Sequence, residues 1–141
     1  RPARSPARGH DCGMIRDTFQ PELDEFIGDL ESYATGSYLT EEDRENWFEP
    51  YDVSAVAEVR DVIERYFDAL DALAAQREPA SQEALLAAVD RVTADLNDVN
   101  AKHDDAVLET EERETLVPLL VRAAHAAGLD EEHDDLPERE F

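Results

Sequence analysis

The chain has 141 residues, a formal net charge of −23 at pH 7 and 42% hydrophobic residues. This length and apolar content suit one domain with a single core and exclude a wholly disordered chain. The strong negative charge argues against binding to nucleic acid or to an anionic membrane surface, and it favours basic partners or metal cations.

The residue composition also bears on the origin of the negative charge and on the cellular compartment. Lys102 is the only lysine and Cys12 the only cysteine. Abundant acid with little lysine is typical of a halophilic proteome or a GC-rich genome, so the charge also has an explanation that involves no partner. A lone cysteine cannot form an intrachain disulfide, and no apolar run reaches the ~20 residues of a membrane helix. We therefore expect a cytoplasmic protein without a membrane partner.

Residues 1–17 are predicted to form a disordered leader. The stretch before Met14 carries arginine, proline and glycine but almost nothing apolar. The same composition fits a vector remnant, translation upstream of a start at Met14, or a basic arm that binds a partner. No apolar segment follows the arginines, so the stretch does not match a secretory signal.

Two helices are expected in the next part of the chain. The first should run from Pro21 to about Ala34, because proline suits the first helical turn and Gly36 stands where a C-terminal cap belongs. The second, a short helix, should begin after Thr40. Acidic residues follow Thr40 directly, where they would face the positive end of the helix dipole.

The longest predicted helix spans Val53 to Ala74, and we expect it to form the centre of the core. Ser54 is expected to cap it, and its acidic residues as far as Asp71 are assigned to the solvent face. The apolar side chains recur at steps of three and four, as one face of a helix requires. Members of this apolar face include Val59, Ile63, Tyr66, Phe67 and Leu70.

Two further helices complete the prediction. One should run from its cap Ser81 to about Asn100, and the other from its cap Thr110 to about Gly128, with a kink at Pro118. Residues 129–141 lack a helical pattern and are predicted to be a flexible acidic tail. No stretch alternates as a strand would. The predicted fold is therefore an all-α antiparallel bundle of four to five helices, in a single domain over residues 18–128.

The sequence carries no strong signature of catalysis or of cofactor binding. The glycines form no phosphate-binding loop, and no serine stands in a nucleophile elbow. The histidines lack the Glu-x-x-His spacing of carboxylate di-metal bundles, and the acidic runs lack the spacing of a calcium loop. We therefore predict no catalytic residue, no cofactor and no metal ion, and a protein that is not an enzyme.

The first candidate site is an aromatic cluster between the short and the long predicted helices. It consists of Trp47, Phe48 and Tyr51, beside dense carboxylates. Aromatic anchors among carboxylates are typical of a surface that binds an Arg- or Lys-rich partner. The alternative is structural: the same side chains plug the end of the bundle, because large aromatic residues are mostly buried.

The second candidate site is a set of polar residues around the connection between the last two helices. We call this set the polar corner. It either caps the two helix ends, with its arginine paired to a carboxylate, or forms a site for a small ligand, a metal ion or a partner. Its members are Asn97, Asn100, His103, Asp104, Glu109, Glu112 and Arg113.

The polar corner also lies in a segment that resembles part of other proteins. The runs Leu96–Asp104 and Leu108–Glu114 resemble a segment of small, acidic, helical bacterial proteins of uncharacterised function. This resemblance is limited to residues 96–114. It implies a bacterial cytosolic helical protein, and it brings no assigned site or activity with it.

Three function hypotheses follow from the sequence. The first is a non-enzymatic acidic interaction protein that binds a basic partner protein, in the manner of an inhibitor, antitoxin or immunity protein. The second is a metal- or small-ligand-binding protein, or an enzyme, that uses the polar corner between Asn97 and Glu112. The third is a self-associating helical protein whose acidity serves only solubility. The sequence leaves the oligomeric state open.

Overall fold

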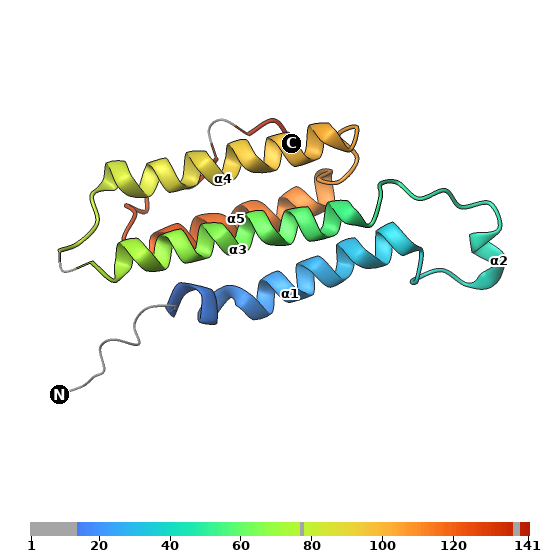
Figure 1. Cartoon of the computed structure of the whole chain (residues 1–141), viewed down its shortest axis with the longest axis horizontal. Helices are drawn as coiled ribbons and strands as arrows, with labels where there is room; N and C mark the ends of the chain where they lie inside the picture. Colours follow the sequence, from blue (N-terminus) through green and yellow to red (C-terminus); the bar gives the residue numbers. More distant parts are fainter. Residues whose placement is uncertain (1–13, 77, 137–138) are drawn as a thin grey trace.

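The computed structural model describes residues 14–76, 78–136 and 139–141. These residues contain five helices and no strand. The four long helices form an antiparallel bundle in which neighbours in the chain are neighbours in space (Figure 1), and this confirms the predicted single-domain all-α fold. The helices are α1 (Met14–Thr35), α2 (Glu41–Arg44), α3 (Ser54–Ala74), α4 (Gln82–Lys102) and α5 (Thr110–Ala126).

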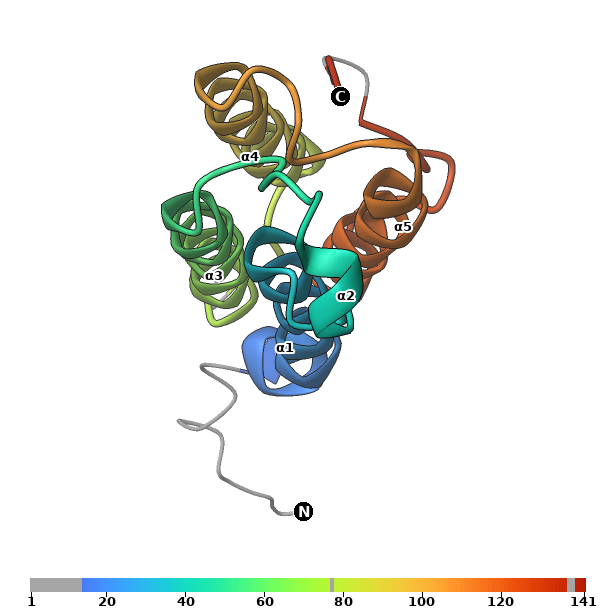
Figure 2. The ribbon, with the colours of Figure 1, turned by 90° about the vertical axis from the view of Figure 1, so that its right-hand side faces the viewer.

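The short helix α2 marks one end of the bundle. At this end α1 and α4 finish and α3 and α5 begin, and Figure 2 views the molecule from this side. We call it the α2 end. The connections on both sides of α2, and the α4–α5 connection, all meet there.

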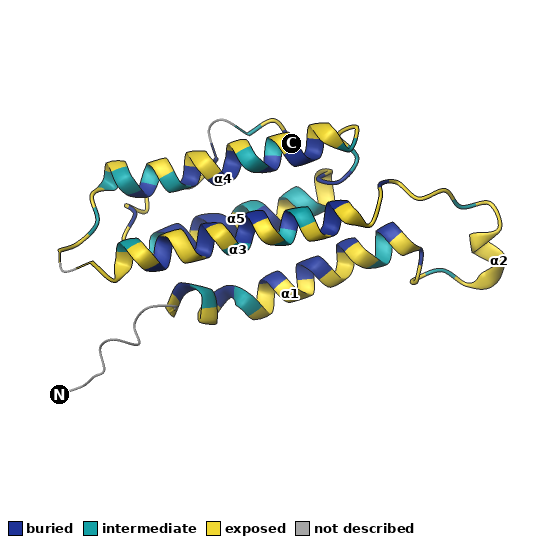
Figure 3. Ribbon diagram, in the orientation of Figure 1, coloured by how far each residue is buried: buried dark blue, intermediate teal, exposed yellow. Residues whose placement is uncertain are grey.

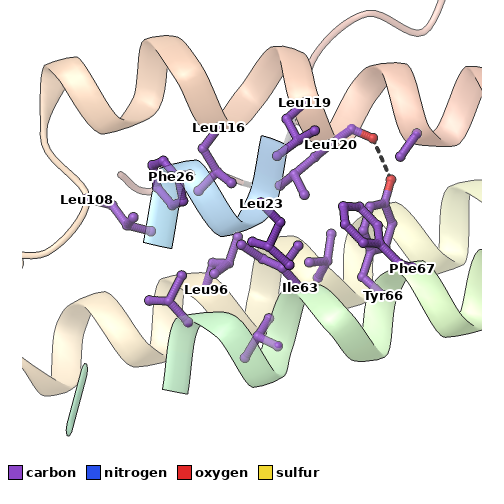
Figure 4. Close-up of a cluster of buried hydrophobic side chains, with 14 of the residues drawn as sticks. Leu23, Phe26, Ile63, Tyr66, Phe67, Leu96, Leu108, Leu116, Leu119 and Leu120 are labelled. Carbon is purple, nitrogen blue, oxygen red and sulfur yellow. Dashed lines mark hydrogen bonds between the residues drawn. The ribbon is translucent and has the colours of Figure 1, made fainter. Parts of the chain in front are cut away.

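The centre of the core is α3, as the apolar pattern predicts. It packs most extensively on α1 and α4, and its buried residues form a continuous stripe (Figure 3). Ile63, Phe67 and Leu70 are 0% exposed. Figure 4 shows Ile63, Tyr66 and Phe67 among leucines from the neighbouring helices, with the Tyr66 hydroxyl donating to the carbonyl of Leu120 at 2.7 Å. Burial of each such side chain stabilises the fold by about 1.5–3 kcal/mol.

Helix α1 begins at Met14, earlier than predicted, so residues 14–17 are helical and not part of a disordered leader. Asp71 of α3 explains the difference. We expected Asp71 on the solvent face, but it is 3% exposed and accepts the backbone N–H groups of Ile15 at 2.6 Å and Arg16 at 3.1 Å. These first-turn groups have no partner within their own helix, so Asp71 caps α1 from another helix. The rest of the predicted leader lies outside the described residues.

Two of the remaining N-terminal caps agree with the prediction. The side chains of Thr40 and Ser81 accept the N–H groups of Asp43 and Ala84. Two caps differ. The cap of α3 is Val53, and Asp52 rather than Ser54 supplies the side-chain oxygen, which accepts the Ser54 N–H at 2.8 Å.

The cap of α5 is Glu109 rather than Thr110. Helix α5 continues through Pro118 as one element. The missing N–H of this proline leaves the carbonyl of Glu114 without its usual donor four residues on.

The C-terminal tail packs on the bundle, in contrast to the flexible tail that the sequence predicts. Leu129, Leu136 and Phe141 are at most 8% exposed. The tail lies beside α4 and α5 (Figure 2), which pack less extensively on each other than α3 packs on its neighbours. Gln82 holds the start of the tail, because its side chain bonds the Gly128 carbonyl and the Asp130 N–H. Three isolated apolar residues give no periodic signal, yet they close the core between these helices.

None of the described helices combines the length and the apolar composition that crossing a membrane requires.

Candidate functional site

The aromatic cluster divides into residues with different roles. Tyr51 is 7% exposed, and its hydroxyl donates to the Leu30 carbonyl at 2.9 Å, so it plugs the α2 end of the bundle. Burial raises the pKa of Tyr51. Trp47 is half-buried against Gly36, where an added Cβ would lie 3.1 Å from the indole ring. Phe48 is 88% exposed. The structural interpretation therefore holds for Tyr51, whereas Phe48 is exposed and does not plug the bundle.

The α4 half of the polar corner is used for internal hydrogen bonds. Asn100 is 3% exposed, and its Oδ1 accepts the N–H groups of Val107 and Leu108 at 3.1 and 2.9 Å. The Asn97 side chain accepts the Glu140 N–H at 2.8 Å and so holds the tail. Asp104 is exposed and has a positive φ of 60° just beyond α4. The contacts of Asn100 and Asn97 hold the α4–α5 connection and the tail on α4.

The side chain of His103 contacts α3. Its Nε2 lies 2.8 Å from Glu58 Oε1, and Lys102 Nζ lies 2.8 Å from the other oxygen of Glu58. The hydrogen bonds from Lys102 and His103 hold the pKa of Glu58 below its usual value. This three-residue contact joins the end of α4 to the first turns of α3.

The α5 half of the polar corner forms a capping box. Glu112 Oε1 accepts the Glu109 N–H at 3.1 Å, and the Glu109 side chain accepts the N–H of Glu112 in return. The expected ion pair of Arg113 is absent among the described residues. Arg113 Nη2 instead donates to Thr110 Oγ1 at 3.4 Å.

A cavity of about 220 Å³ joins parts of both candidate sites at the α2 end. Its walls come from the end of α1, the connections around α2 and the start of α5, and we call it the tyrosine–glutamate cavity. A second hollow, of about 110 Å³, shares Tyr33, Glu111 and Glu112 with it. The cavity is lined by Tyr33, Tyr38, Pro50, Tyr51, Ala106, Glu109, Glu111 and Glu112.

Tyr33, Tyr38 and Glu111 line the cavity, although the sequence does not indicate them as site residues. Tyr33 and Tyr38 contact each other edge to face, with ring centroids 5.5 Å apart. They lie on both sides of the end of α1, and Glu111 lies in the first turn of α5. Only the tertiary structure brings these residues together, and no local pattern in the sequence marks them.

The electrostatics of the tyrosine–glutamate cavity favour a positively charged group. Burial raises the pKa of Glu112, and repulsion from Glu109 and Glu111 adds to this effect. Burial and the charge of Glu111 also raise the pKa of Tyr33. A raised pKa at an acidic group indicates that negative charge is unfavourable there. A guanidinium or ammonium group would relieve this and would also contact the aromatic rings.

The described part of the chain contains no group of three or more His, Cys, Asp or Glu side chains arranged to hold a metal ion. Comparisons of the chain with protein-family models, with curated proteins and with solved structures find no match.

Proposed function

We propose that the protein is a non-enzymatic interaction protein that binds a basic partner protein at the α2 end. The observation that carries this proposal is the tyrosine–glutamate cavity, with its tyrosine rings and its carboxylates at Glu109, Glu111 and Glu112. A single Arg or Lys side chain of the partner enters this cavity. The net charge of −23 attracts the partner and speeds association.

Exposed aromatic residues at the α2 end support a protein partner. Phe48 is 88% exposed and Tyr38 is 57% exposed. Exposed large aromatic side chains are unfavourable in water and are enriched at the centres of protein interfaces. They supply the apolar contact that the carboxylates alone lack.

A protein partner is favoured over a small ligand by the exposed aromatic residues and by the contacts around the cavity. Phe48 is 88% exposed and does not line the cavity, so a small ligand within its volume of about 220 Å³ would leave Phe48 in water. In addition, Asn100 and His103 of the polar corner already make internal hydrogen bonds. A cavity of this size is sufficient for one side chain of a larger partner.

The proposal is tested by titration with a short arginine-rich peptide, with an equal peptide of glutamine as the neutral control. Trp47 is the only tryptophan, and its ring packs at the α2 end, so its fluorescence reports on this end alone. We expect saturable binding of the arginine peptide only. We also expect its affinity to fall with added salt, because salt screens attraction between opposite charges.

Three variants locate the binding. Glu111→Gln and Tyr38→Ala should each weaken binding by about five- to tenfold, through a lost charge and a lost cation–π contact. Glu83→Gln is the matched control, because it makes the same charge change at the first turn of α4, at the opposite end of the bundle. Equal weakening by Glu83→Gln and Glu111→Gln would show that the peptide follows net charge and not the cavity.

A further inference from the structure

A separate groove, of about 190 Å³, lies between α3 and α4. Val62, Tyr66 and Val92 are buried and give it an apolar floor. Ala69 and Ala88 lie on its walls, and their small side chains leave the space between the two helices open. The hydroxyl of Tyr66 points away to Leu120, so the ring itself contributes to the apolar surface.

Each wall of the groove also carries one arginine. Arg65 of α3 uses its Nε to bond Asp61 at 3.0 Å, and Arg91 of α4 uses its Nε to bond Asp95 at 3.2 Å. In the described part of the chain, the terminal Nη atoms of both arginines make no hydrogen bond. Both side chains are more than half exposed, at 55% and 73%. Two guanidinium groups are thus held at the edges of the groove with donors available for a ligand. Asp95, which bonds Arg91, also lines the groove.

We propose that this groove binds a small organic carboxylate with a short aromatic or branched aliphatic body. The body lies on Val62, Tyr66 and Val92, and the carboxylate lies between the Nη groups of Arg65 and Arg91. Guanidinium groups match carboxylates because their paired N–H donors can bond both oxygens. A neutral ligand would fill the same apolar floor but leave these donors unused.

The charge of the whole protein sets the affinity of this site. The net charge of −23 opposes the approach of any anion, and Asp61 and Asp95 already offset part of the positive charge of the arginines. We therefore expect a dissociation constant of about 1 mM, which corresponds to a small ligand with few contacts. This site lies between α3 and α4, does not use the tyrosine–glutamate cavity, and does not depend on the proposed function.

The test uses phenylacetate as the probe and phenylacetamide as its neutral analogue, at constant ionic strength. Methyl NMR signals of Ala69 and Ala88 should shift saturably with phenylacetate, and phenylacetamide should bind at least about tenfold more weakly. Arg65→Gln and Arg91→Gln should each weaken phenylacetate binding by about tenfold, because each removes a charge-assisted contact. Ala88→Leu fills the groove and should abolish binding.

Arg60→Gln is the matched control, since Arg60 is also on α3 but pairs with Asp24 of α1 and Glu64. It should change the affinity less than about twofold, as expected for a residue outside the groove. The proposal is overturned if phenylacetamide binds as tightly as phenylacetate, or if Arg60→Gln weakens binding as much as Arg65→Gln. Absence of saturable shifts at about 10 mM phenylacetate, ten times the expected dissociation constant, also overturns it.

Discussion

Substitution of Asp71 by alanine should destabilise the bundle strongly. The same substitution at an exposed aspartate usually has little effect on stability. Asp71 is 3% exposed and accepts the N–H groups of Ile15 and Arg16 at 2.6 and 3.1 Å. Alanine would leave both groups without this partner at the start of α1. It would also remove a negative charge from the positive end of the helix dipole.

The expected loss of stability follows from the two hydrogen bonds that Asp71 accepts. A hydrogen bond to a charged acceptor contributes about 1.5–3 kcal/mol, and loss of an N-cap alone costs about 0.5–2 kcal/mol. Water can reach part of the first turn, because Arg16 is only half-buried. We therefore expect Asp71→Ala to lower the free energy of unfolding by about 2–4 kcal/mol. For a domain of this size, the thermal midpoint should fall by about 8–16 °C.

Urea and thermal denaturation followed by circular dichroism measure this loss, and amide hydrogen exchange of Ile15 and Arg16 reports on the cap itself. Asp71→Asn keeps an acceptor and loses the charge, so it should cost about half as much. The matched control is Asp68→Ala, one turn earlier on α3. Asp68 is 55% exposed and pairs with the Arg16 side chain at 3.0 Å, so its loss should cost less than about 1 kcal/mol.

Equal and small losses for Asp71→Ala and Asp68→Ala would refute this reasoning. They would mean that α1 does not begin at Met14 in solution, or that its first turn needs no cap. Unchanged hydrogen exchange at Ile15 and Arg16 in Asp71→Ala would lead to the same conclusion.

Four further predictions concern the core, the tail and the charge. Phe67→Ala should lower the free energy of unfolding by about 3–5 kcal/mol in urea denaturation, through lost burial and the cavity left behind. Deletion of residues 130–141 should lower the free energy of unfolding by about 2–4 kcal/mol, because the burial of Leu136 and Phe141 is lost and the chain entropy no longer spent on ordering the tail offsets only part of this loss. An unchanged thermal midpoint would mean that the tail does not dock on the bundle. The thermal midpoint should rise between about 0.1 M and 1 M sodium chloride, as the screening length falls from about 10 Å to 3 Å and like charges repel less. Affinity for the arginine peptide should fall as the pH falls through the raised pKa of Glu112, because protonation removes a negative charge, and Glu112→Gln should flatten this part of the profile.

The four long helices could be predicted because their signals are local. Apolar steps of three and four mark the face of α3 that is buried, and Thr40 and Ser81 act as caps within a few residues of their partners. The start of α1 could not be predicted in this way. Its cap, Asp71, is 56 residues away from Ile15 in the chain, and in the sequence it is one more acidic residue on a charged helix. A pattern within one helix cannot show that a carboxylate is needed by another.

The candidate sites show the same limit. The sequence marks the aromatic cluster and the polar corner as separate features, and the structure places Tyr51 of the first beside Glu109 and Glu112 of the second. Further walls of the cavity come from residues that belong to no motif, among them Tyr33 and Tyr38. The α4 half of the polar corner stands out in the sequence for its spacing, but Asn100 holds the α4–α5 connection and His103 contacts Glu58.

The placement of the few cations also bears on function. Among the described residues, several of them join different helices: Arg16 and Arg60 join α1 to α3, Arg122 joins α5 to α1, and Lys102 joins α4 to α3.

Exposed pairs of this kind contribute at most about 1 kcal/mol each, so stability alone does not require a cation at any one of these positions. In the part of the chain that the structure describes, no internal cation pairs with the carboxylates of the tyrosine–glutamate cavity. Arg113 is adjacent in the chain to Glu112, yet it bonds Thr110, and within the described residues Glu109, Glu111 and Glu112 form no ion pair. A basic side chain from a partner would therefore meet three carboxylates that line one cavity and have no counter-charge among the described residues. One of them, Glu112, is already partly buried. The basic side chain would reach them without displacing an internal arginine.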